Sequence, residues 1–287
     1  MHRQVGRVID QQASWAKPVG DKAQELLKDV FAPRRRVKDF LNGTWLGHPV
    51  HPMVTDVPVG AMTVAAVLDA AGQDTAADLA IATGLAGMAA SAVSGAADAV
   101  DAYGKPQVYA TVHASLMVSS LAAYAASMVL RAGPRGVRPL ARLLSFAGYG
   151  ALAAGAYVGG DLTYRLGHQV DRHAFDSQGT KWKPLDVAEV PAGQLVRATA
   201  GKDTLVLYRA SDADPITALH AVCAHEGGPL DKGTIVDGCV ECPWHQSRFR
   251  LEDGHVMQGP AVYDQPRFEV RVAEGGGLEA RRVPDTD

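Results

Sequence analysis

The sequence predicts a multidomain protein: an N-terminal all-α bundle of four transmembrane helices, followed by an all-β antiparallel sandwich. A length of 287 residues allows two domains. Residues 54–163 carry 12 charged side chains in 110 positions, whereas residues 181–287 carry 29 in 107. The hydrophobic pattern also changes between these regions, from long uncharged runs to short strand-like segments. The formal net charge of −3 excludes a dedicated nucleic-acid binder, which is usually strongly basic.

Residues 1–42 are expected to form a basic amphipathic segment. Apolar residues at helical spacing within 26–31 predict a helix at the membrane interface. The basic run 34–36 is interpreted as facing anionic lipid, because Lys38 and Asp39 fit a twin-arginine export signal poorly. Polar residues interrupt the N-terminal stretch, so a conventional signal peptide is not expected.

Residues 43–175 are expected to form the transmembrane domain. They contain apolar stretches long enough to cross the ~30 Å hydrocarbon core as helices. An Ala- and Gly-rich soluble bundle is the alternative, but a helix that is apolar on all sides must be buried or lie in lipid. Frequent small residues suit close helix packing in a bilayer. The stretches are 54–71, which contains Asp56 and Asp69, and 79–97, 106–130 and 143–160.

Four spans place both ends of this domain on the same side of the membrane. The segments expected on the N-terminal side carry 12 basic residues, and the connection 131–142 on the other side carries 4. The positive-inside rule therefore predicts a multi-pass protein of the cell inner membrane, with both termini and the β domain in the cytoplasm.

Residues 182–284 are expected to form the sandwich. Short segments rich in β-branched and aromatic residues are separated by Gly, Asp and Pro, which is typical of antiparallel strands and turns. The predicted strands are 204–209, 216–222, 234–236, 248–251 and 267–272.

Two short motifs in this region predict a metal centre. Cys223-x-His225 is followed by Cys242-x-x-His245, so each motif supplies one thiolate and one imidazole. These four ligand types also suit zinc, but zinc motifs usually pair Cys with Cys and His with His. One Cys and one His from each loop favour a two-iron cluster, with both thiolates on one iron and both imidazoles on the other.

Around these ligands the chain resembles the Rieske [2Fe–2S] family over roughly residues 182–284. The resemblance implies a Rieske-type sandwich that binds a [2Fe–2S] cluster through Cys223, His225, Cys242 and His245 and transfers single electrons. The matching positions are 223–230 (CAHEGGPL), 231–233 (DKG), 242–245 (CPWH), Phe249, Gly254 and 259–261 (GPA).

The resemblance also implies which neighbours adjust the reduction potential. High-potential members have a disulfide between the two loops, and here Gly228 and Trp244 stand at those positions. Ser247 matches a serine that lies near the cluster, whereas Phe249 replaces a tyrosine and lacks its hydroxyl. We therefore expect a potential below the quinol-oxidising type, within the broad Rieske range of about −150 to +300 mV. The neighbours expected around the cluster are Gly228, Pro229, Trp244, Ser247, Phe249 and Pro260. Gln246 stands where Gly is commonest, and Cys239 is interpreted as a strand thiol.

Histidines in the membrane half form a second candidate site. His48 and His51 open the first span and His113 lies in the third, so a haem b or proton site is one interpretation. The alternative is that the histidines cap and connect helices. Residues 42–175 resemble a bacterial four-helix membrane domain of uncharacterised function that also occurs fused to Rieske domains. The matching stretches are 46–52 (LGHPVHP), 58–60 (PVG) and 159–165 (GGDLTYR).

These observations support three functional hypotheses. The first is a membrane-anchored iron–sulfur protein that carries single electrons to or from a redox partner protein or quinol. The second is a haem-containing membrane oxidoreductase linked to quinol. The third is an electron-transfer component of an oxygenase system; a complete oxygenase is not expected, because little sequence follows the β domain to hold a mononuclear iron site. The lipid bilayer is an expected partner, and nucleic acid is not.

Overall fold

The computed structural model describes residues 2–176 and 179–284. The chain divides into two compact units. The helical unit contains residues 1–41 and 49–168, and the β unit contains residues 42–48 and 169–287. The short segment 42–48 therefore belongs to the β unit, although it precedes most of the helical unit in the sequence.

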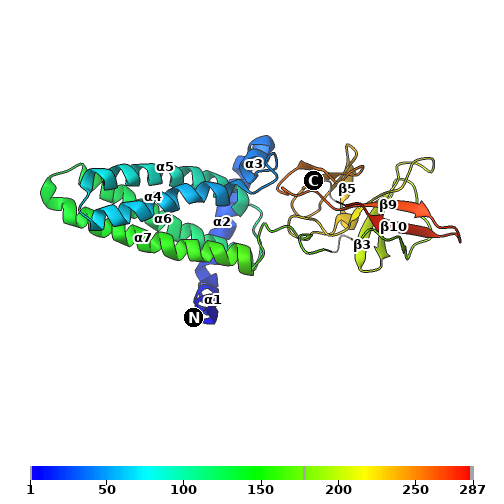
Figure 1. Ribbon diagram of the computed structural model, residues 1–287, viewed down its shortest axis with the longest axis horizontal. Helices are drawn as coiled ribbons and strands as arrows, with labels where there is room; N and C mark the ends of the chain where they lie inside the picture. The colour runs from blue at the N-terminus through cyan, green and yellow to red at the C-terminus, as the bar shows by residue number, and fades with distance from the viewer. Residues whose placement is uncertain (1, 177–178, 285–287) are drawn as a thin grey trace. The chain divides into compact units, whose positions relative to one another are not determined.

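Long parallel and antiparallel helices form the core of the helical unit (Figure 1). Within the described residues, four helices are long and apolar enough to cross a membrane, which confirms the predicted membrane-capable region. Only 22–33% of the residues in their apolar windows are buried, so most of the apolar surface faces outward, as expected for helices in lipid. The helices are α4 (Val50–Ala70), α5 (Asp74–Ala99), α6 (Lys105–Arg131) and α7 (Arg138–Gly160).

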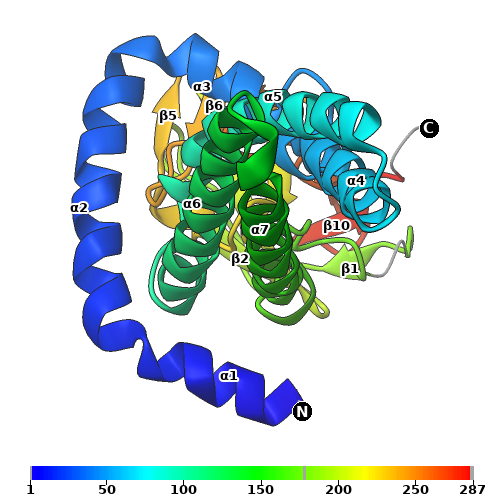
Figure 2. The same cartoon turned by 90° about the vertical axis from the view of Figure 1, so that its left-hand side faces the viewer.

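The N-terminal helices lie on the outside of this bundle (Figure 2). They are α1 (His2–Gln11), α2 (Ala13–Phe31) and α3 (Arg35–Asn42). Helix α2 crosses the direction of the long helices at one end of the bundle and packs on α6, where the Gln107 amide donates to Gln24 at 2.9 Å. Leu26 is 57% exposed, whereas Phe31 is buried against Ala97 and Val100. The expected interfacial segment is thus the end of a helix that is partly packed on the bundle.

Inside the bundle, small residues allow close helix contacts, and a buried arginine pairs with two carboxylates. A Cβ on Gly84 would lie 2.6 Å from the Met62 methyl, so the glycine lets α4 and α5 approach closely. Arg131 is buried and pairs with Asp69 and Asp78. A buried charge is costly unless it is paired. The network therefore joins the end of α4, the start of α5 and the end of α6.

The β unit contains two antiparallel sheets in its described residues, which confirms the predicted all-β class. The six-stranded sheet has the order β1 (Lys183–Pro184), β10 (Leu278–Arg282), β9 (Arg267–Val272), β4 (Thr217–His220), β3 (Asp203–Tyr208) and β2 (Val196–Ala200). The four-stranded sheet has the order β5 (Thr234–Val236), β6 (Cys239–Glu241), β7 (Arg248–Arg250) and β8 (Val256–Gln258). Each predicted segment coincides with β3, β4, β5, β7 or β9; the other five described strands were not predicted.

The hydrophobic core of the β unit reaches the candidate metal centre. Phe249 on β7 is fully buried and lies opposite Val240 on β6. Both residues share one apolar cluster with Cys223 and Cys242. The first motif follows β4, and the second connects β6 to β7. The ligand loops are therefore attached to strands whose inner faces form the core.

Candidate metal centre

The two motif loops have the same backbone structure. In each loop the cysteine N–H donates to the carbonyl five residues later, and the N–H four residues later donates back to the cysteine carbonyl. The bonds are Cys223 N to Gly228 O (2.8 Å) and Gly227 N to Cys223 O (2.9 Å) in the first loop, with Cys242 N to Ser247 O (2.8 Å) and Gln246 N to Cys242 O (3.0 Å) in the second.

This shared structure explains the unusual position of Gln246. The equivalent residue of the first loop is Gly227, with φ of +78°, and Gln246 has φ of +63°. This left-handed region favours glycine, since a side chain crowds the backbone there. The second loop thus adopts a glycine-type conformation with a glutamine, and the Gln258 amide bonds the Gln246 carbonyl at 2.7 Å.

The structure brings the four sequence-predicted ligands together. The Nδ1 atoms of His225 and His245 lie 3.2 Å apart. The two thiols lie within hydrogen-bond reach of each other, and none of the described cysteines forms a disulfide. Cys223, Cys242 and His225 are at most 4% exposed, whereas His245 is half-buried. Two sulfurs and two ring nitrogens thus converge in a mostly dry site near the surface.

Backbone N–H groups donate hydrogen bonds to both cysteine sulfurs and so stabilise their negatively charged thiolate forms. Cys223 accepts from the N–H groups of His225 and Glu226, and Cys242 accepts from those of Trp244 and His245. The Cys223 thiol donates to Cys242, which lowers the pKa of Cys242 to about 7 and raises that of Cys223. Metals bind the thiolate, so amide donors aimed at sulfur favour metal binding.

Gly228 allows the two loops to approach each other. A Cβ there would lie 2.6 Å from Cys242 Sγ and 3.2 Å from the Trp244 ring, so only hydrogen fits. The two positions at which high-potential Rieske proteins carry a disulfide are thus adjacent in space, but neither is a cysteine. The paired thiols, paired imidazoles and glycine-lined approach fit a [2Fe–2S] cluster with two protein ligands per iron.

The remaining expected neighbours surround the same loops. Pro229 pairs with Val222 through a β-bridge. The Ser247 hydroxyl oxygen accepts from the Ala261 N–H at 3.0 Å, which attaches the second loop to the segment after Pro260. Ser247 and Phe249 are both fully buried, whereas Trp244 is 55% exposed. Cys239 lies in β6, as interpreted from the sequence.

The sequence did not reveal two buried polar side chains, His173 and Gln265, that bond the backbone of the first loop. The Gln265 side chain accepts from Ala224 N–H at 2.9 Å and donates to Val222 O and His220 O. The Nε2 of His173 lies 2.7 Å from Val222 O. The segments around 173, 222 and 265 are distant in sequence, and neither His173 nor Gln265 belongs to a local motif. Only burial marks them, since His173 is 4% and Gln265 2% exposed.

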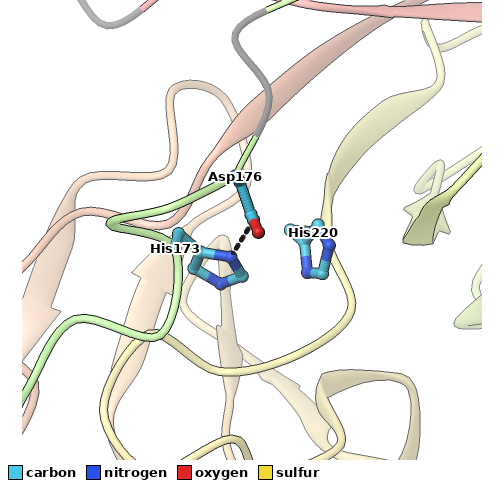
Figure 3. Close-up of side chains that lie close together, drawn as sticks. All are labelled: His173, Asp176 and His220. Atoms are coloured by element: carbon cyan, nitrogen blue, oxygen red, sulfur yellow. Dashed lines mark hydrogen bonds and ion pairs between the residues drawn. The ribbon is translucent and has the colours of Figure 1, made fainter.

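His173, Asp176 and His220 also form a candidate metal site (Figure 3). One ligand atom from each lies within 4.8 Å of the others. However, the His173 ring already bonds Asp176 at 2.6 Å and Val222 O, and His220 Nδ1 accepts from Val222 N–H. The buried Arg282 guanidinium lies 3.8 Å from the Asp176 carboxylate, where it would repel a metal cation. We interpret the cluster as one that stabilises the fold through its hydrogen bonds.

The membrane histidines separate into two groups. His51 and His113 lie together in the helical unit, with ring centroids 6.3 Å apart. His48 is exposed and lies in segment 42–48 of the β unit. The structure therefore keeps two of the three sequence candidates as one cluster.

Replacing Gly228 by alanine should reduce the iron and acid-labile sulfide content of the purified protein. The added methyl overlaps Cys242 Sγ, and overpacking of this kind costs about 1–3 kcal/mol. Gly275→Ala is the matched control, because that glycine faces open space without a left-handed φ. Full iron and sulfide content in Gly228→Ala would contradict the packing argument.

His220 should make the β unit less stable in mild acid. Burial, followed by repulsion from His173 and Arg282, lowers the pKa of His220 to about 4, against the attraction of Asp176 and Asp203. The unfolded chain takes up this proton below pH 6.5 and the native chain does not, so stability falls from pH 6.5 towards 4, by at most about 3 kcal/mol.

Thermal unfolding followed by near-ultraviolet circular dichroism checks this effect. His220→Gln, which can still accept from Val222 N–H, should lose less stability than wild type between pH 7 and 4.5. His255→Gln removes an exposed histidine of the same unit and should behave as wild type. Equal losses in all three proteins would exclude His220 as the titrating group.

The family comparisons agree with this geometry. Residues 181–269 match the model of the Rieske [2Fe-2S] domain, and residues 47–172 match the model described as "Predicted membrane protein (DUF2231)". The anthranilate 1,2-dioxygenase ferredoxin subunit of Burkholderia cepacia is 28% identical over 96 residues, which are 33% of this chain and 87% of that protein. The cytochrome bc1 complex Rieske iron-sulfur subunit of Streptomyces lividans is 38% identical over 66 residues, which are 23% of this chain and 39% of that protein.

Other relatives are matched over a smaller share of their length. Apoptosis-inducing factor 3 of Mus musculus is 30% identical over 86 residues, which are 30% of this chain but 14% of that protein. Among solved structures, the complex of reduced oxygenase and oxidized ferredoxin in carbazole 1,9a-dioxygenase has 25% identity and a TM-score of 0.31, over 39% of this chain and 100% of the matched chain. From its two family matches, the chain joins a Rieske [2Fe-2S] domain to a DUF2231 predicted membrane domain.

Proposed function

We propose that this protein is a membrane-anchored Rieske electron carrier that exchanges single electrons with a redox partner protein or quinol. One observation carries the proposal: two equivalent loops bring two buried thiols and two imidazoles together inside a domain that matches the Rieske model. The names of the matched relatives, a ferredoxin subunit and a bc1 Rieske subunit, support electron transfer.

The ligand set favours uptake of an electron. Two ferric ions, two sulfides and two thiolates sum to zero charge, whereas four thiolates would leave two negative charges. Neutral imidazoles at His225 and His245 therefore make reduction easier than in an all-cysteine site. A bound [2Fe–2S] cluster supplies one-electron exchange, and the protein supplies the charge balance and the amide donors to sulfur.

The exposed side of the second loop gives a place for contact with a partner. His245 is half-buried and its neighbour Trp244 is 55% exposed, whereas both cysteines are buried. An electron that leaves through the imidazole side crosses less protein than one that leaves through the core. A partner protein that docks over Trp244 and His245 would approach the redox centre most closely. The ferredoxin-subunit relative makes an oxygenase or reductase component a suitable class of partner.

The helical unit is proposed to anchor this carrier in the inner membrane. Its outward apolar surface supports insertion in a bilayer. The excess of basic residues on the side of both termini supports a cytoplasmic position for the Rieske domain.

A haem-containing membrane oxidoreductase linked to quinol is the second candidate function. It needs a second redox group in the helical unit, and the pairing of His51 with His113 is the observation that favours it. Haem b in the purified protein would separate this function from that of a carrier with a cluster alone.

The principal test is the spectrum and potential of the cluster in purified full-length protein. Wild type should give a Rieske electron paramagnetic resonance signal and a potential below that of quinol-oxidising members. His225→Ala should lose the signal, because one iron loses a ligand. A full Rieske signal in His225→Ala, or no iron and sulfide in wild type, would overturn the proposal.

Ser247→Ala should lower the reduction potential while the cluster remains bound. The Ser247 oxygen accepts from Ala261, so its O–H remains able to donate towards the cluster and stabilise the reduced state. A hydrogen bond to a charged group is worth about 1.5–3 kcal/mol, which corresponds to roughly 60–130 mV for one electron. Redox titration measures the shift, and Ser211→Ala, at an exposed serine, is the control. An unchanged potential would show that this hydroxyl does not donate to the cluster.

A reporter fused after Asp287 checks the orientation. A cytoplasmic reporter such as green fluorescent protein should be active there, and a reporter that needs export should be inactive. The opposite pattern would place the Rieske domain outside the cytoplasm and refute the proposed orientation.

A further inference from the structure

The long helices of the helical unit form two hairpins, and each hairpin orients one histidine through the same kind of hydrogen bond. The first hairpin is α4 with α5, and the second is α6 with α7. His51 on α4 donates from Nδ1 to the Ser91 carbonyl on α5 at 2.9 Å. His113 on α6 donates from Nδ1 to the Gly155 carbonyl on α7 at 2.8 Å. Each histidine thus bonds the backbone of the following helix.

Each hairpin also has a glycine that packs closely against its histidine ring. Gly95 lies four residues after Ser91, and Gly159 lies four residues after Gly155. A Cβ at Gly95 would lie 2.8 Å from the His51 Cε1, and one at Gly159 would lie 3.2 Å from the His113 Cε1. A carbonyl acceptor followed one turn later by a close glycine is therefore repeated in both hairpins, so the two rings occupy equivalent sites.

This arrangement makes both histidines suitable as metal ligands. A carbonyl oxygen can only accept a hydrogen bond, so each Nδ1 carries the proton and each Nε2 carries a lone pair. In the described residues, neither Nε2 has a hydrogen-bond partner. Metal-binding histidines usually donate their other ring N–H to a backbone carbonyl or carboxylate, which fixes the tautomer and the ring orientation.

The spacing of the rings fits one shared metal atom. The centroids lie 6.3 Å apart, with an interplanar angle of 87°. Two imidazoles that bind opposite sides of one atom, at metal–nitrogen distances of ~2.0–2.1 Å, have centroids about 6 Å apart. The rings lie on different hairpins, so such an atom would lie between the two repeats.

The small number of protein ligands near these two histidines limits which metal group they could bind. A structural zinc ion needs about four protein ligands. Within the described residues, the clusters of three or more potential ligands that the structure shows lie in the β unit, away from His51 and His113 in the sequence. A metal held by two imidazoles alone must bring its other ligands with it. Haem does so, because its porphyrin supplies four nitrogens, and its apolar edge suits helices whose surface is mostly apolar.

We propose that His51 and His113 are the two axial ligands of one haem b, bound between the α4–α5 and α6–α7 hairpins. Two axial histidines fill the coordination of the iron, so the site is suited to electron transfer and not to binding oxygen. This inference deepens the second candidate function by naming its site, and it does not depend on the cluster.

The test is the haem content of full-length protein purified in mild detergent from cells grown with the haem precursor 5-aminolevulinate. Wild type should contain one haem b per chain by the pyridine haemochrome assay and give a low-spin, six-coordinate spectrum. His51→Ala and His113→Ala should each lower bound haem by about tenfold or more. His48→Ala, at a histidine of the connecting segment, should keep wild-type haem. Cluster content measured in the same samples shows whether the β unit of each variant is folded, and far-ultraviolet circular dichroism shows whether its helices are retained.

Two further variants keep the outcome clear. Imidazole added to His113→Ala should restore a low-spin spectrum, because it replaces the lost ring in a site that is otherwise intact. Cys223→Ser should lose the cluster and keep the haem, which separates failure of this site from failure of the electron-carrier proposal. Wild type with a full cluster and no haem, or haem unchanged in both histidine variants, would overturn the inference.

Discussion

The close approach of the two ligand loops is the constraint on which the metal centre depends. Gly228 and Cys242 Sγ come so near that no side chain fits between them. Each loop directs two backbone N–H groups at its own cysteine sulfur. The glycine contact therefore brings together two sulfurs that already accept hydrogen bonds. The inner faces of the adjacent strands, with Phe249 fully buried, support the loops from below. The centre is thus positioned by backbone geometry and core packing, and the histidines complete it from the surface side.

The segments that join the two units in sequence are both bound to this centre within the β unit. Arg172 N–H donates to the Ala224 carbonyl at 3.2 Å, and His173 bonds the Val222 carbonyl beside it. On the other side, the Thr44 hydroxyl donates to the Ala261 carbonyl at 3.3 Å, next to the Pro260 segment. Both connections therefore contact the ligand loops or the segment that packs against them. His173 and Gln265 both bond the Val222 carbonyl, so the same backbone group of the first loop contacts this connection and the segment before β9.

The parts that sequence predicted are those determined by local patterns. The ligand motifs lie in two short loops, and the four apolar helices are long uncharged runs, so each is visible without tertiary information. Strand β10 was missed because its sequence, LEARR, contains no β-branched or aromatic residue. Gln246 had no sequence explanation, because its left-handed backbone becomes evident only when the second loop is compared with the first. His173 and Gln265 meet across about 90 residues, and the grouping of His51 with His113 instead of His48 depends on how two hairpins pack.

The two units orient their candidate metal ligands with opposite backbone groups, and secondary structure explains the difference. In the ligand loops, N–H groups left unpaired by the turns point at sulfur, and the Nδ1 atoms of His225 and His245 face each other at 3.2 Å. Inside helices, N–H groups are already bonded along the axis, and only carbonyl lone pairs remain to accept. His51 and His113 therefore donate from Nδ1 to helix carbonyls, which leaves Nε2 as the atom able to bind a metal. The loops thus stabilise thiolate sulfur, and the helices hold imidazole with a free ring nitrogen. These donors suit the proposed cluster in the β unit and the proposed haem in the helical unit.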